Sequence, residues 1–163
     1  MNYYIGCHLV KAEPGIKTGS GNVYIYDKHT EGISMLKSRD DVHYIEGYQV
    51  IYDDGREDFI PKDIFEKSHI ILEDNPLLPG KVSISGPMVE DFIKSYEVIE
   101  RDNKTVIVYA TLKNGFVMVE SSSCVDTENY SVDIGVQICL GRIRNKIWEL
   151  LRFVLQSAYT GFN

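Results

Sequence analysis

The side chains best suited to chemistry lie in one short segment, residues 121–129, with the sequence SSSCVDTEN. Hydroxyl, thiol, carboxylate and amide groups crowd there between a predicted strand and a predicted long helix. Two interpretations stay open. Backbone N–H groups at the helix N-terminus, together with arginines further along the helix, could hold an anion. Ser, Asp and Asn are also what a helix N-cap and its approach require, and the residue types alone favour this local role.

A basic cluster follows on the predicted helix, where Arg142, Arg144, Lys146 and Arg152 stand against a single acid, Glu149. The cluster could hold a small anion, or it could be an ordinary solvated helix face. The whole chain has a net charge of −7, which argues against a general binder of duplex nucleic acid.

Residues for catalysis or metal binding are sparse. None of the four histidines forms a pair with metal-ligand spacing: His8, His29, His43 and His69. No histidine follows residue 69 to act as a base for Cys124 or Cys139, so nucleophilic cysteine catalysis is not expected. The acidic run at residues 53–58 lacks the pattern of a calcium-binding loop. We therefore expect no enzymatic activity and no cofactor.

The cysteines and the apolar runs indicate the compartment. Three widely spaced cysteines, Cys7, Cys124 and Cys139, are typical of reduced thiols in a cytosolic protein. The N-terminal residues lack the basic and apolar regions of a signal peptide. No apolar run approaches the roughly 18 residues that a spanning helix needs. The sequence therefore predicts a soluble cytoplasmic protein with no membrane partner.

Elements that could position these groups fall into two modules. Residues 1–75 form a predicted β-rich module, with a strand over Tyr3–Lys11 that ends at Glu13-Pro14-Gly15. The stretch GIKTGSG that follows is expected to be flexible, and Val23–Tyr26 is a second short strand. Residues 31–41 fit either a short helix or a loop.

The same module ends in a predicted hairpin and helix. Strands are predicted over Tyr44–Tyr52 and Glu57–Ile60. The Asp-Gly pair between them predicts a tight hairpin turn, because Gly takes the positive φ that such a turn needs. A short helix over Lys62–Lys67 then begins next to Pro61. Residues 76–85, with their prolines and glycine, are the predicted linker.

Residues 86–163 form the second predicted module. A helix over Pro87–Tyr96, capped by Ser85 or Gly86, has one apolar face. A hairpin of Thr105–Leu112 and Phe116–Val125 turns at Asn-Gly, and a long helix covers Ser131–Ala158. Gly135 and Gly141 each cost about 1 kcal/mol against Ala in a helix interior, which predicts a bend near Gly141 or close packing against a strand. The predicted fold class is α+β: a β-rich N-terminal module, then a helix–β-hairpin–long helix module with an antiparallel sheet.

The second module resembles a known family over about residues 86–156. The segments YATLKNGFVMVESSSCVDTENYSVDIG and NKIWELLRFVL have the motif order of the N4/Sf6-type family of small phage and prophage accessory proteins. That family is associated with the first described anti-Thoeris proteins, which sequester cyclic ADP-ribose signals. The N-terminal segments at residues 3–11 and 46–69 are similar to a module that recurs in phage proteins, without an assigned function.

The resemblance implies a homo-oligomer in the host cytoplasm that traps a cyclic nucleotide signal without cleaving it. It implies that Phe116 stacks on the base, that Asp126 and Asn129 contact base or ribose, and that Arg144 holds phosphate. We add Arg142 as a ligand candidate, although it cannot share the helix face of Arg144 unless the helix is irregular there. The segment GRIRNK departs from the family pattern at this point.

Two other functions stay open. The acidic first half of the chain could meet a basic host protein, which would make the chain an accessory factor acting by protein contact. A phosphodiesterase that degrades the same signals is the third hypothesis, and the shortage of catalytic residues speaks against it.

Overall fold

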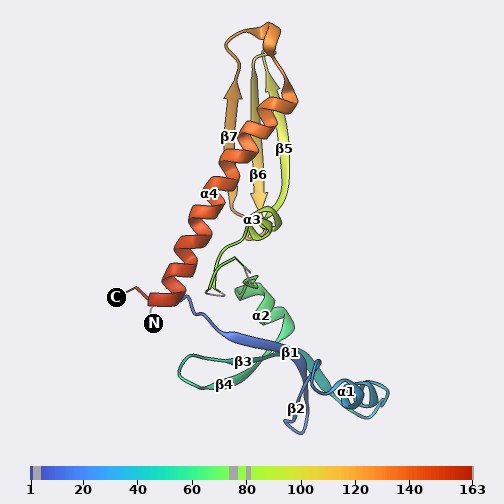
Figure 1. The fold of residues 1–163 in the computed structure, drawn as a ribbon. Coiled ribbons are helices and arrows are strands. Elements are labelled where there is room, and N and C mark those ends of the chain that lie inside the picture. The colour runs from blue at the N-terminus through green and yellow to red at the C-terminus, as the bar shows by residue number, and fades with distance from the viewer. Residues whose placement is uncertain (2–4, 74–76, 80–81, 163) are drawn as a thin grey trace. The chain divides into compact units, whose positions relative to one another are not determined.

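The computed structural model describes residues 1, 5–73, 77–79 and 82–162. The chain divides into two compact units, Met1–Ile71 and Leu72–Asn163. The fold is mixed α+β with antiparallel sheets and a long C-terminal helix, as the sequence predicts (Figure 1). Of the predicted linker at 76–85, residues 76, 80 and 81 lie outside the described residues. Within the described ranges, no helix has both the length and the apolar character needed to cross a membrane.

The first unit is built on a four-stranded antiparallel sheet in the order β2-β1-β3-β4. Its strands and helices are β1 (Lys11–Thr18), β2 (Val23–Ile25), α1 (Thr30–Lys37), β3 (Tyr44–Ile51), β4 (Glu57–Pro61) and α2 (Lys62–Ser68). The hairpin predicted around Asp-Gly is confirmed, with Gly55 at a φ of 81°. The ambiguous segment at 31–41 is largely the helix α1, and the helix predicted over Lys62–Lys67 is α2.

The prediction for the first strand is wrong. Residues 3 and 4 lie outside the described residues, residues 5–10 form no strand, and β1 begins at Lys11. Pro14 and Gly15 do not end the strand. Pairing with β2 starts only at Gly15, so the β1–β2 ladder does not require the N–H that Pro14 lacks. A Cβ on Gly15 would lie 2.3 Å from the backbone oxygen of Tyr24, so glycine permits the close strand approach here.

The second unit is a three-stranded antiparallel sheet with one long helix against it (Figure 1). Its elements are α3 (Gly86–Phe92), β5 (Ile93–Arg101), β6 (Thr105–Leu112), β7 (Val117–Ser123), a 3-10 turn η1 (Thr127–Asn129) and α4 (Val132–Thr160). The predicted hairpin is β6 and β7, and Ser85 caps α3 by accepting a hydrogen bond from the Met88 amide over 3.3 Å.

The helix predicted over Pro87–Tyr96 is too long. Helix α3 ends at Phe92, and the chain continues as β5, which pairs with β6 from Ile93 onward. The apolar residues of this window satisfy a helical period as far as Tyr96, but pairing with a full strand gives their backbone groups hydrogen-bond partners in a sheet. The predicted hairpin is therefore the greater part of a three-stranded sheet.

Helix α4 holds the core of this unit against β6 and β7. Val108, Ala110, Ile143 and Cys139 are each 0% exposed. The helix runs without a break through Gly141, where a Cβ would meet nothing within 4 Å. The predicted bend near Gly141 is therefore not found, whereas the alternative, close packing against a strand, is found at the other helix glycine, Gly135, which packs against Val106 of β6.

Candidate functional site

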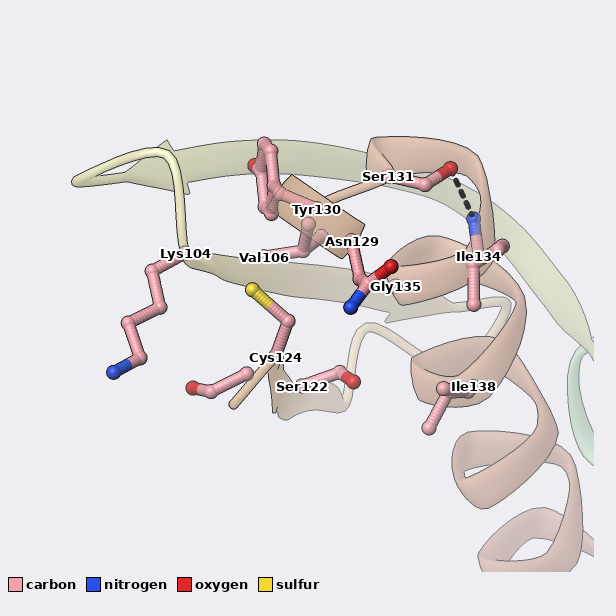
Figure 2. Close-up of a pocket in the computed structure, with 11 residues that line it drawn as sticks. Lys104, Val106, Ser122, Cys124, Asn129, Tyr130, Ser131, Ile134, Gly135 and Ile138 are labelled. Carbon is pink, nitrogen blue, oxygen red and sulfur yellow. Dashed lines mark hydrogen bonds between the residues drawn. The ribbon is translucent and has the colours of Figure 1, made fainter. Parts of the chain in front are cut away.

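A pocket lies where α4 begins, beside the ends of β6 and β7 (Figure 2). It is small, with a volume of about 100 Å³. Its polar lining comes from Lys104 on the β5–β6 turn, Ser122 and Ser123 at the end of β7, and Cys124 and Asn129 just after β7. Its apolar lining comes mainly from Ile134 and Ile138 on α4. Polar and apolar side chains thus share the lining, and Lys104 lies at its edge (Figure 2).

The segment that forms the pocket is fixed by its own hydrogen bonds. The Asp126 carboxylate accepts from the Glu128 amide over 3.0 Å and caps η1. The Asn129 amide donates to the Asp126 carbonyl over 3.1 Å, which closes the turn. The Ser131 hydroxyl accepts from the Ile134 amide over 3.4 Å and caps α4. The cap interpretation of this segment is therefore confirmed, while the side chain of Asn129 lines the pocket.

Tyr130 connects the pocket to β5. Its hydroxyl donates a hydrogen bond to the Glu100 carboxylate over 2.9 Å. Desolvation and this carboxylate raise the pKa of the Tyr130 hydroxyl, so it stays a protonated donor. The contact ties the approach to α4 to the edge strand of the sheet.

Of the five predicted ligand residues, Asp126 and Asn129 lie at this end of the sheet. Phe116 lies at the other end, just before β7, and is 57% exposed rather than part of the core. The seven residues of β7 separate the two ends by about 20 Å. One small ligand therefore cannot touch both Phe116 and Asn129 of the same chain.

The two arginines point to different neighbours. Arg142 donates to the Ser121 carbonyl over 2.8 Å and lies 3.9 Å from the Glu120 carboxylate, beside Lys146, which also pairs with Glu120. Arg144 pairs with Glu90 of α3. The structure does not bring Arg142 and Arg144 together, because residues two positions apart on an uninterrupted helix do not share a face. The arginine of the Arg142–Glu120 pair is 54% exposed but its acid is only 13% exposed, and in the Arg144–Glu90 pair the arginine is 34% exposed. A phosphate would have to displace these carboxylates to reach either arginine.

The sequence prediction missed several residues that line the pocket, above all Lys104. The sequence places Lys104 directly before a predicted strand, but it does not show which residues lie beside it in space. Lys104 closes the β5–β6 turn, and the Cys124 amide donates to its carbonyl over 2.9 Å. Placing it beside the end of β7 requires the register between β6 and β7, in which Thr105 faces Ser123.

The thiols give a test of this geometry. Cys139 is fully buried against the sheet, and its desolvation raises the pKa of the thiol, whereas Cys124 is half-buried in the open pocket. Since the thiolate is the reactive form, we expect iodoacetamide to label Cys124 at least tenfold faster than Cys139 in the folded protein. Peptide mass spectrometry measures both rates. Equal rates in native buffer, with both slower than in denaturant, would contradict the placement of the pocket.

Within the described residues, no group of three or more His, Cys, Asp or Glu side chains is arranged to hold a metal ion. The pocket lining contains none of Asp, Glu or His. The lining residues are therefore suited to holding polar parts of a ligand next to apolar side chains.

Comparison with known proteins places this unit in a family. Residues 81–159 match the model of the phage protein (N4 Gp49/phage Sf6 gene 66) family. No curated protein and no solved structure matches the chain. The matched segment contains α3, the three-stranded sheet, η1 and all but the last residue of α4, and so it includes the whole pocket. Residues 81–159, which include nearly all of the second unit, thus belong to the phage protein (N4 Gp49/phage Sf6 gene 66) family.

Proposed function

We propose that this phage protein binds and sequesters a cyclic nucleotide immune signal without cleaving it, as a counter-defence protein in the host cytoplasm. The ligand class is a cyclic ADP-ribose isomer, with cyclic oligonucleotides as related candidates. The anti-Thoeris activity associated with the family is the biological role that this binding would serve. The observation that carries the proposal is that polar side chains, among them Ser122 and Asn129, line the pocket together with the apolar Ile134 and Ile138.

The chemistry of the pocket suits such a ligand. The Lys104 ammonium can pair with a phosphate, while the Asn129 amide and the Ser122 hydroxyl can bond to ribose or base edges. Ile134 and Ile138 offer an apolar surface for a ring. Binding without cleavage is the simplest outcome for a lining that lacks carboxylate and imidazole groups.

The size of the pocket supports a homo-oligomer. Pockets that enclose a small molecule are usually about 300–1,000 Å³, and this pocket is about 100 Å³. One chain can therefore hold a phosphate or ribose, and a second chain would cover the rest. A second chain would also allow an exposed Phe116 to stack on the base, a contact worth about 1–3 kcal/mol.

A panel of purified ligands tests the proposal. Thermal shift is measured with cyclic ADP-ribose isomers and cyclic di- and trinucleotides, for the wild type, Phe116→Ala and Lys104→Ala. One ligand should raise the melting temperature by several degrees, and each variant should weaken its binding about tenfold or more. Lys94→Ala, a change of another exposed lysine on the same sheet, is the matched control. Absence of a shift with every ligand would contradict the proposal.

A second candidate is an accessory protein that acts by binding a host protein. The observation in its favour is the acidic first part of the chain, where residues 1–75 carry 8 basic and 14 acidic residues. Such a surface would suit a basic partner. Pull-down from host lysate with charge-neutralised variants of this unit as controls separates this candidate from signal binding.

A further inference from the structure

The segment that joins β7 to α4, residues 124–130, forms one side of the pocket (Figure 2). We call this segment the strap. At its start, the Cys124 amide donates a hydrogen bond to the Lys104 carbonyl over 2.9 Å. At its end, the Tyr130 hydroxyl donates to the Glu100 carboxylate over 2.9 Å. The strap is therefore tied to the β5–β6 turn at one end and to the edge strand β5 at the other.

The part of the strap between these two contacts has little other support. Residues 125–129 are all exposed, and Val125 is 98% exposed. Among the described residues, their hydrogen bonds are the local ones of the turn at Asp126. Exposed backbone with few buried contacts opens easily. Asn129, whose side chain lines the pocket, directly precedes Tyr130, so its position follows that of Tyr130.

The register of the sheet places Glu100 beside the pocket. Val106 of β6 is paired with Glu100 of β5 on one side and with Ser122 of β7 on the other. Paired residues of neighbouring strands point to the same face, so these three side chains form one row on the face that α4 covers at Gly135. Val106 and Ser122 line the pocket (Figure 2). Glu100 therefore stands at the β5 end of this row, where Tyr130 reaches it.

The ring and the hydroxyl of Tyr130 have different partners and different effects. The ring packs against the hydrophobic core of the second unit, which includes Val106. Apolar packing is non-directional, whereas a hydrogen bond to a carboxylate fixes both a distance and a direction. The ring therefore holds the strap against the core, and the bond to Glu100 determines where along the end of the sheet the strap lies.

We propose that Glu100 is a positioning residue of the pocket: through the Tyr130 hydroxyl it holds the strap, and with it the Asn129 side chain, in the arrangement that receives the ligand. The inference deepens the proposed function and rests on it for its biological use. A pocket whose polar groups are already in place loses less conformational freedom on binding, so its affinity is higher. Without the bond to Glu100, the ligand would have to order the strap itself.

Hydrogen exchange without ligand tests the positioning. Peptide mass spectrometry measures amide exchange in the strap, β6 and α4 for the wild type, Tyr130→Phe, Glu100→Ala and Glu100→Gln. Tyr130→Phe keeps the ring, and Glu100→Gln keeps an acceptor oxygen. Exchange in the strap should be about threefold faster or more in Tyr130→Phe and Glu100→Ala, with β6 and α4 unchanged. Glu100→Gln should recover most of the protection that Glu100→Ala loses.

Glu97→Ala is the matched control, because Glu97 is an exposed acid on the same strand whose side chain lies on the opposite face. It should leave exchange in the strap unchanged. Two results would overturn the inference. Unchanged exchange in Tyr130→Phe would mean that the bond does not hold the strap, and faster exchange throughout the second unit would mean that the bond only stabilises the fold.

Binding of the cyclic ADP-ribose isomers and cyclic oligonucleotides gives the functional readout. A ligand that the wild type binds should bind about tenfold more weakly to Tyr130→Phe and to Glu100→Ala, with no further loss in the double variant, because both changes remove the same bond. Equal binding to the wild type and these variants would overturn the inference. If the wild type binds none of the ligands, the proposed function fails, whereas the exchange measurement still decides whether Glu100 positions the strap.

Discussion

Ile143→Ala should reduce the free energy of unfolding of the second unit by about 2–5 kcal/mol, because it leaves a cavity in the centre of the core. Ile143 is 0% exposed and lies on the face of α4 that packs on the sheet. The buried residues that form the core with it come from α3, β6, β7 and α4, so closing the space would require several elements to move. Trp148 is the only tryptophan and lies on the same helix, so its fluorescence during urea denaturation reports on this unit.

Ile134→Ala is the matched control for this prediction. Ile134 lies on the same helix but is 62% exposed. It should lose less than about 1 kcal/mol, since little apolar surface is returned to water. Equal losses for the two variants would mean that α4 does not pack on β6 and β7 through the face described.

Gly135→Ala should destabilise the second unit by about 1–3 kcal/mol, although alanine is the better helix former. A Cβ at this position would lie 2.7 Å from Cγ2 and 2.9 Å from Cβ of Val106. The branched valine sits on a central strand and cannot turn away from both contacts. Helix α4 would have to move off the sheet beside the pocket, so we expect ligand binding to weaken in the same variant.

Gly141→Ala should instead raise the free energy of unfolding of the second unit. A Cβ there would meet nothing within 4 Å, so the variant should gain up to about 1 kcal/mol from helix propensity alone. The double variant Gly135→Ala/Val106→Ala should recover part of the loss, because the smaller residue on β6 makes room. If both glycine variants are stabilised in urea denaturation, the close contact between α4 and β6 is absent.

Local patterns in the sequence predicted much of the second unit. The Asn-Gly turn fixes the β6–β7 hairpin, with Gly115 at a φ of 84°, and the apolar stripe with its Ser131 cap defines α4. Strand β5 could not be predicted in the same way. Its first residues continue the helical period of α3, and only pairing with β6 decides between the two conformations.

The candidate site was harder to predict because it depends on register and distance. The sequence identifies Asp126 and Asn129 as polar residues at a helix approach, but it does not show that Lys104 lies beside them. It also does not show that Phe116 lies at the far end of β7. For Gly135 and Gly141 the sequence gives the same signal, and only the position of Val106 distinguishes a tight contact from open space.

The most direct test of sequestration follows the ligand itself. Purified protein is mixed in slight excess with each cyclic ADP-ribose isomer or cyclic oligonucleotide at about micromolar concentration, and the free ligand is measured by filtration and mass spectrometry. The complex is then heated, and the released ligand is measured again. Sequestration predicts that one ligand disappears from the filtrate and returns intact and in full after heating. Recovery of a cleaved product, or a filtrate unchanged for every ligand, would contradict it.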